Sequence, residues 1–169
     1  MKLTPTLLCL SLLATTFIGG CDRMSGSTNP TADRAEIERV IKSSITWAAT
    51  KDKPLLYDCF VNDSTLFFFS PENSGTTRGF DQFTRDVEQV FMDPRFRAVR
   101  ADFKDLRIDL SAGGDCAWWS CYLDDFNEWD GRPANWENVR WTGVLEKLDS
   151  RWKIRQMHFS HAAEDFKGK

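Results

Sequence analysis

The chain has 169 residues, a formal net charge of −3 at pH 7 and seven tryptophans. Mild acidity without a basic cluster argues against nucleic acid as a partner, and two histidines without a Cys-x-x-Cys pair argue against a zinc site. The sequence shows no phosphate-binding glycine loop, dinucleotide fingerprint or nucleophile triad, so we expect neither a metal nor an organic cofactor.

The first twenty residues are typical of a targeting segment. Lys2 is their only charge, and residues 7–18 form an apolar run that is too short to span a bilayer. The run ends in Ile18-Gly19-Gly20-Cys21, which resembles the lipobox of bacterial lipoproteins. The resemblance implies cleavage before Cys21, lipidation of that cysteine, and a membrane-anchored protein on the extracytoplasmic face of the bacterial cell envelope. Ordinary secretion is the alternative.

A polar segment and then a helix follow this leader. Residues 21–32 contain Gly, Pro and Ser without periodicity, which predicts a tether. The remainder, residues 33–165, has the usual size of one domain. A helix is predicted over residues 33–50, because apolar residues recur there at helical spacing and Asp33 with Glu36 forms the pattern of a capping box.

Two more helices and one strand are predicted before the middle of the chain. Pro54 suits the first turn of a short helix over residues 55–60. Residues 65–69 form a short apolar run that is typical of a strand. Residues 80–91 place phenylalanine and valine at helical spacing, and Pro94 ends that pattern.

The second half of the chain alternates as strands do. In residues 99–110 the apolar positions change parity near Asp105, which predicts a β-bulge. Residues 116–125 alternate regularly, and residues 136–160 form two runs joined by a tight turn, which predicts a hairpin. The sequence therefore predicts an α+β fold with three N-terminal helices packed on a curved, four-stranded antiparallel sheet.

The hairpin turn at Asp149-Ser150 fixes a register for the last two strands. With regular alternation, Gln156 and His158 share the core-facing side with Trp141 and Trp152. This face is apolar near the turn and polar at the other end. It predicts the lining of a cavity open at one end, with a core that becomes polar at its rim as the alternative.

This order of elements resembles the nuclear transport factor 2-like superfamily. Residues 66–71 (LFFFSP), 105–111 (DLRIDLS), 136–147 (WENVRWTGVLEK) and 151–160 (RWKIRQMHFS) resemble its SnoaL-like subset. The resemblance implies a cone-shaped domain with a cavity between helices and sheet, and often a homodimer through the outer sheet face. It does not transfer an activity, because the superfamily includes isomerases, cyclases, dehydratases, hydrolases and non-enzymatic binding domains.

Three residues are candidates for acid–base catalysis. His158 is a candidate because a histidine side chain in a cavity can serve as a general acid or base. Asp124 and Asp125 end a strand at the expected cavity mouth, where desolvation would make a carboxylate a useful base. The alternatives are a hydrogen-bonded core histidine and a solvated strand end.

Aromatic residues are candidates for the wall of an apolar pocket, although most large aromatic residues simply form core. The predicted ligand-binding residues are Trp47, Tyr57, Phe69, Trp119, Trp141 and Gln156. The leading hypothesis is a lipid-anchored domain that binds a small apolar or aromatic molecule in an internal cavity. The alternatives are an isomerase, cyclase or hydrolase that uses His158 with Asp124 or Asp125, and a non-catalytic assembly module. Whether the chain is an enzyme is left open.

Overall fold

The computed structural model describes residues 29–71 and 75–162. The predicted signal peptide, the lipobox cysteine Cys21 and most of the tether lie outside these ranges. All three predicted helices are present, the last of them continued by a π-helical segment. The helical segments are α1 (Pro30–Thr46), the 3-10 segment η1 (Trp47–Ala49), α2 (Lys53–Asp58), α3 (Phe80–Asp86) and the π-helix η2 (Val87–Phe91). Within the described ranges, no helix is long and apolar enough to cross a membrane.

Helix α1 begins earlier than predicted. Asn29 is its N-cap, because the Asn29 side-chain oxygen accepts a hydrogen bond from the Ala32 amide at 3.2 Å and Pro30 occupies the first turn. The predicted cap, Asp33, is instead a buried residue inside the helix, with 5% of its surface exposed. The Asn-Pro pair is the stronger start signal, since Pro supplies a helical φ angle and needs no amide partner.

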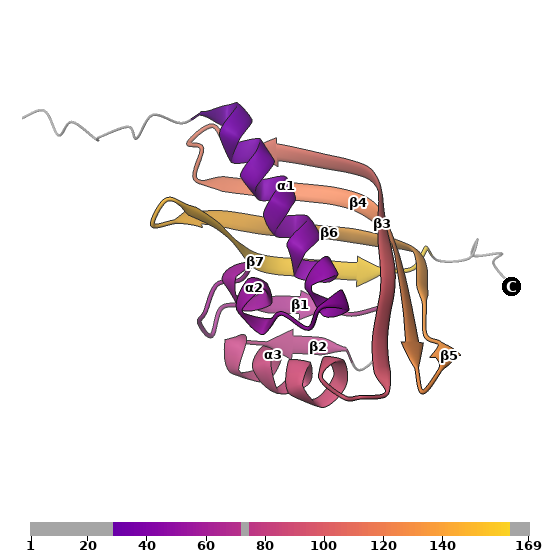
Figure 1. The fold of residues 1–169 in the computed structure, drawn as a ribbon. Helices are drawn as coiled ribbons and strands as arrows, with labels where there is room; N and C mark the ends of the chain where they lie inside the picture. The colour runs from indigo at the N-terminus through magenta and orange to yellow at the C-terminus, as the bar shows by residue number, and fades with distance from the viewer. Residues whose placement is uncertain (1–28, 72–74, 163–169) are drawn as a thin grey trace, which may run out of the picture.

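The strands form one curled, mixed sheet in front of which α1 runs (Figure 1). They are β1 (Phe67–Phe69), β2 (Thr76–Arg78), β3 (Phe96–Leu110), β4 (Cys116–Trp129), β5 (Arg132–Pro133), β6 (Trp136–Leu148) and β7 (Arg151–Ser160). The spatial order is β2-β1-β7-β6-β4-β3, with β5 paired to β4. Strands β3, β4, β6 and β7 form the predicted antiparallel meander, whereas β1 adds to β7 in parallel.

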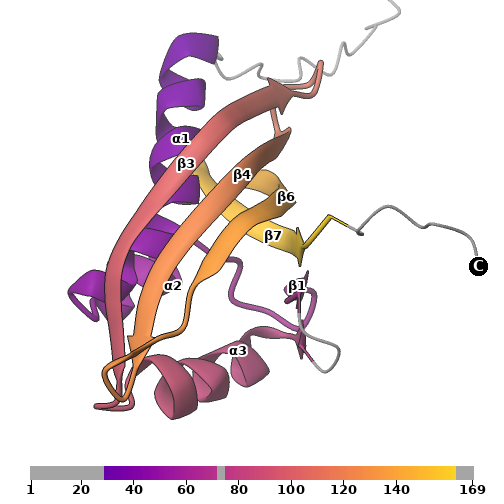
Figure 2. The same cartoon turned by 90° about the vertical axis from the view of Figure 1, so that its right-hand side faces the viewer.

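Bulges bend the long strands, whose curvature is visible in Figure 2. The predicted bulge is confirmed: the β3–β4 register shifts between Lys104 and Arg107, and Asp105 has a φ of 53°. A further shift lies in β6 at Asn138, whose φ is 55°. The helices α1 and α2 cover one side of the bent sheet, which we call the inner face (Figure 1).

A bulge in β7 overturns the predicted hairpin register. Leu145 faces Ile154 as expected, but Val144 pairs with Gln156, so Arg155 is an extra residue. One extra residue exchanges the two faces of the strand beyond it. Met157 and Phe159 are therefore buried, whereas Gln156 and His158 lie on the outer face. The prediction that both point toward the helices is wrong.

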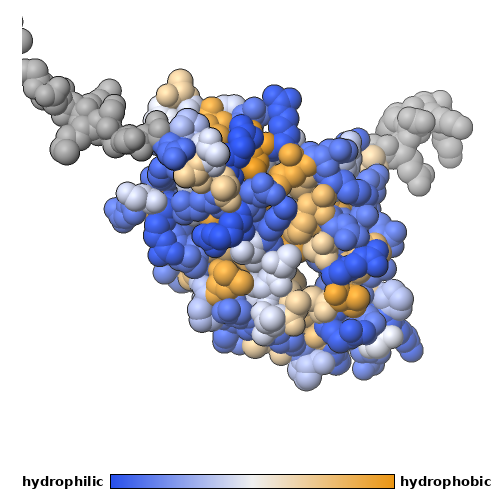
Figure 3. Space-filling model, turned by 45° about the horizontal axis from the view of Figure 1, so that its top comes forward, coloured by the Kyte–Doolittle hydropathy of each residue, from blue (hydrophilic) through white to orange (hydrophobic). Residues whose placement is uncertain are grey.

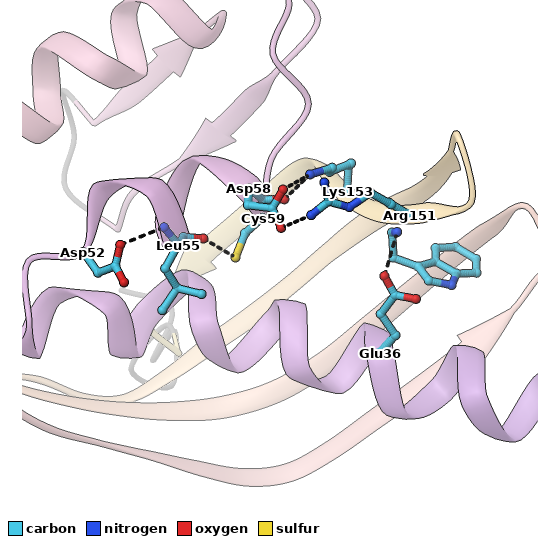
Figure 4. A network of polar contacts seen from close by, with 8 residues as sticks. Glu36, Asp52, Leu55, Asp58, Cys59, Arg151 and Lys153 are labelled. Carbon is cyan, nitrogen blue, oxygen red and sulfur yellow. Dashed lines mark hydrogen bonds and ion pairs between the residues drawn. The ribbon is translucent and has the colours of Figure 1, made fainter.

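Polar contacts fasten the helices to the β6–β7 hairpin. In Figure 4 the Asp58 carboxylate of α2 lies between Lys153 and Arg151 of β7, and the Lys153 Nζ to Asp58 Oδ1 distance is 2.7 Å. The carboxylate of Glu36 in α1, labelled in the same view, accepts a hydrogen bond from the Trp152 backbone amide at 3.4 Å. These contacts hold the two helices against β7.

A further contact of this kind is buried at the first turn of α1. The Asp33 Oδ1 atom accepts hydrogen bonds from Lys147 Nζ at 2.5 Å and from the Trp152 indole at 2.9 Å. The Lys147 hydrogen bond is the main cause that holds the pKa of Asp33 below its usual value. Outside this core, the surface seen obliquely over the α1 side is mostly hydrophilic, with scattered hydrophobic groups (Figure 3).

Candidate functional site

A continuous line of aromatic rings runs along the inner face of β4, β6 and β7. The ring centroid of Trp136 lies 5.4 Å from that of Phe159, and Phe159 stacks on Trp141 at 5.5 Å with an interplanar angle of 7°. Trp141 in turn meets Trp119 edge-on at 5.3 Å. Trp119 and Trp141, both predicted as ligand-binding residues, are therefore brought together in the interior.

Gly143 makes this line possible. It pairs with Trp119 across β4 and β6, and the Trp119 indole lies over it. An added Cβ at Gly143 would stand 2.1 Å from the Trp119 Cη2 atom and 2.4 Å from the Gln156 carbonyl oxygen. No side chain fits there, so glycine is required by the close approach of a ring and a backbone.

The interior holds polar atoms that have no hydrogen-bond partner in the part of the chain that the structure describes. The indole nitrogens of Trp119 and Trp141 are buried without a hydrogen bond, and so is the side-chain oxygen of Asn127. Buried polar groups in folded proteins are nearly always paired with protein or water. The inner face therefore holds two N–H donors and one acceptor that no described residue satisfies.

Asp125 stands at the Trp136 end of the aromatic line. It shares its parity on β4 with the buried Leu123 and Asn127, and it pairs with Trp136 across the ladder. Burial raises the pKa of Asp125, and a hydrogen bond from the Asn127 side chain offsets part of that effect. A carboxyl group in this state can act as a proton donor or as a strengthened base.

Asp124 and His158 lie on the opposite side of the sheet from Asp125. The Asp124 carboxylate accepts hydrogen bonds from the Asn138 amide at 2.6 Å and from Lys104 Nζ at 2.9 Å, and these contacts lower its pKa. It thereby stabilises the β6 bulge. His158 is exposed, edge-on to Phe69 at a centroid distance of 5.6 Å. One chain therefore does not bring His158 together with Asp125.

The other predicted ligand-binding residues are dispersed. Trp47 is buried and contacts Phe91 edge-on, and Tyr57 packs against Phe80 at 5.4 Å. Phe69 is 44% exposed at the end of β1, and Gln156 lies on the outer face. None of these four joins the line of rings from Trp136 to Trp119.

Sequence reasoning missed Asn127, Trp136 and Phe159 as inner-face residues. Extending the alternation of β4 beyond residue 125 would have found Asn127, since β4 itself contains no extra residue. Phe159 was hidden by the β7 bulge. Over the ranges that the structure describes, no group of three or more His, Cys, Asp or Glu residues is arranged to hold a metal ion.

The curled sheet with helices on one side defines the nuclear transport factor 2-like fold, as similar solved structures show. The model of the SnoaL-like domain family matches residues 37–164, and the chain belongs to this family. A comparison with curated proteins gives no match.

Solved structures support the fold and leave the activity open. A nuclear transport factor 2-like superfamily protein from Salmonella enterica serovar Typhimurium has a TM-score of 0.67 at 19% identity, covering 83% of this chain and 98% of its own. A candidate dehydratase from Streptomyces avermitilis reaches 0.65 at 14% identity, with coverages of 80% and 99%. A candidate aromatic ring hydroxylase from Novosphingobium aromaticivorans reaches 0.65 at 17% identity, with coverages of 81% and 94%.

Proposed function

We propose that this SnoaL-like domain binds a small, largely apolar or aromatic molecule against the inner face of its sheet. The observation that carries the proposal is the pair of buried indole N–H groups on Trp119 and Trp141, which have no hydrogen-bond partner among residues 29–71 and 75–162. An apolar wall with a few convergent polar groups is the usual composition of a small-molecule site. The ligand class is an aromatic or alicyclic body that carries a hydrogen-bond acceptor such as a carbonyl oxygen.

The test is a binding titration of the full chain with a panel of aromatic ketones and phenols. Trp141→Phe keeps a ring but removes the N–H, so we expect it to weaken binding about tenfold, the value of one hydrogen bond in a dry site. Trp118→Phe on the outer face is the matched control and should leave affinity unchanged. Equal losses in both variants, or no saturable binding across the panel, would contradict the proposal.

An acid–base enzyme is the second candidate, and Asp125 is the observation that favours it. Its pKa is raised by burial beside the aromatic line, as a general acid or base requires. Asp124 and His158 do not share its face, so the proposed catalysis uses Asp125 alone from the predicted set. Asp125→Asn should abolish turnover of a bound panel molecule while binding persists. Turnover that survives this substitution would remove Asp125 from the mechanism.

We further propose that lipid on Cys21 anchors the domain on the extracytoplasmic face of a bacterial membrane. The support is the Ile18-Gly19-Gly20-Cys21 motif after an apolar run. Cys21→Ser should move the protein from the membrane fraction to the soluble fraction and remove the lipid mass. A protein that stays in the membrane fraction after this change would contradict the proposal.

A homodimer through the outer sheet face is the corresponding proposal for the assembly alternative. It predicts that the full chain sediments as a dimer at micromolar concentration. A monomer under those conditions would contradict the homodimer and leave small-molecule binding as the proposed function of the domain.

A further inference from the structure

We infer that Trp118 of each copy inserts into a hollow on the outer face of the other copy and so anchors the homodimer. The inference rests on the homodimer proposed above and names the side chain and the receiving surface that join the two copies. The hollow has a volume of about 390 Å³ and extends over β3, β4, β6 and β7, with Trp118 among its lining residues. A two-fold symmetric interface packs one patch against itself, so a projecting side chain and a hollow within one patch can fill each other.

The exposed aromatic side chains of the domain gather on the outer face. Among the Phe, Tyr and Trp residues that the structure describes, the most exposed are Trp118 at 47%, Phe69 at 44% and Tyr122 at 40%. Trp118 and Tyr122 have the opposite parity to the buried Trp119, and Phe69 pairs with His158, so all three lie on this face. Aromatic residues are enriched at protein–protein interfaces, which favours a protein partner here.

Short side chains explain why the outer face is hollow beside Trp118. Ser120 pairs with Thr142 across β4 and β6, so two small hydroxyl side chains lie side by side. The lining also includes Gly143, which has no side chain, and Trp119, whose ring lies over Gly143 on the inner face. The hollow therefore ends on the layer that carries the inner aromatic line, and the indole of the second copy would pack against that layer.

The charges around the hollow suit contact with an identical surface. Arg107 Nε donates to Asp109 Oδ2 at 2.8 Å, and an Arg155 guanidinium nitrogen lies 2.7 Å from Glu146 Oε2. In a symmetric interface like charges face like charges, and a buried charge is costly unless it is paired. Pairing within each copy lowers both costs before the two faces meet.

The first experiment is sedimentation equilibrium of the full chain and two variants. Trp118→Ala should raise the dimer dissociation constant about a hundredfold or more, because both copies lose an anchoring aromatic side chain. Tyr122→Ala is the matched control, since Tyr122 is an exposed aromatic residue of the same face that does not line the hollow. We expect its dissociation constant to rise about tenfold or less.

The second experiment mixes two variants that each fail alone. Ser120→Phe fills the hollow and keeps the indole of Trp118, so two such copies should clash. An equimolar mixture with Trp118→Ala should form heterodimers, because one copy supplies the indole and the other supplies the open hollow. We expect the mixture to associate at least about tenfold more tightly than either variant alone.

The possible failures can be told apart. A wild-type chain that is monomeric at micromolar concentration would remove the homodimer and this inference with it. A wild-type dimer that Trp118→Ala weakens no more than Tyr122→Ala would leave the homodimer in place and overturn the role of Trp118. A mixture that associates no better than its components would overturn the fit of indole and hollow. Circular dichroism of every variant establishes that each is folded, as their exposed positions lead us to expect.

Discussion

The two faces of the central sheet use the same residue types under opposite conditions. Trp141 on β6 is fully buried among other rings, while Trp118 on the neighbouring strand β4 is 47% exposed. Asp125 faces inward and has a raised pKa, while its neighbour Asp124 faces outward and has a lowered one. Strand parity, and the bulges that reset it, therefore decide what each residue can do here.

Replacing a tryptophan by alanine should give the largest difference in stability between the two faces. Trp141→Ala removes a fully buried indole that contacts Phe159 and Trp119, and we expect a loss of about 3–5 kcal/mol in the free energy of unfolding. In the monomer, Trp118→Ala should stay within about 0.5 kcal/mol, as exposed substitutions usually do. Urea unfolding of both variants at concentrations that keep them monomeric measures the difference, and similar losses would contradict the contrast between the faces.

Adding one methyl group on β6 should likewise lower stability more on the inner face than a substitution does on the outer face. Gly143→Ala places a Cβ 2.1 Å from the Trp119 ring and 2.4 Å from the Gln156 carbonyl oxygen, so we expect a loss of about 1–3 kcal/mol or more. The adjacent outer-face change Thr142→Ala is the control and should cost about 0.5 kcal/mol or less. Thermal unfolding reports both. A Gly143→Ala protein as stable as the control would mean that Trp119 moves freely.

Removing the buried carboxylate of α1 tests how the helix is fastened. Asp33→Ala leaves the Trp152 indole N–H without its acceptor, so we expect a loss of about 1–3 kcal/mol at pH 7. The pKa of Asp33 is lowered in the folded state, so its contribution is present above its unfolded pKa of about 3.9 and is lost as the pH falls through the lower native value. Acid titration of unfolding should therefore show wild type and variant converging at low pH. A difference that persists at the acid end would contradict this assignment.

The smallest expected changes in stability have opposite signs at the adjacent residues Asp124 and Asp125. Burial raises the pKa of Asp125, so ionising it above its unfolded pKa of about 3.9 costs stability, and Asp125→Asn should stabilise the protein at neutral pH. Hydrogen bonds lower the pKa of Asp124, so Asp124→Asn should destabilise at neutral pH and matter less in acid. Unfolding midpoints from pH 3 to 8 test the pair. Equal signs would place both carboxylates in one environment.

The parts of the fold that depend on local patterns were predictable from the sequence. The apolar stripe of α1, the meander and the bulge at Asp105 each leave a signal within a few residues. The α1 start was misjudged because two capping patterns overlap and Asn29-Pro30 wins. The alternation of residues 116–125 correctly placed Trp119 on the inner face.

The position of His158 could not be predicted from the hairpin alone. The register deduced from the turn at Asp149-Ser150 is correct as far as Ile154, and Arg155 then interrupts it. Arg155 carries no local sign of a bulge; its side chain pairs with Glu146 on β6 and with Asp63 in the loop before β1. A bulge that depends on such distant partners appears only when the whole sheet is assembled.

The buried hydrogen bonds of Asp33 also have a mechanical consequence. A pull applied at Asn29 enters the domain through the first turn of α1, where Asp33 is bonded to Lys147 on β6 and Trp152 on β7. The load is shared at once with two paired strands that run through the core. Tension at this end would therefore be resisted by the hairpin in shear, before the helix could peel away turn by turn.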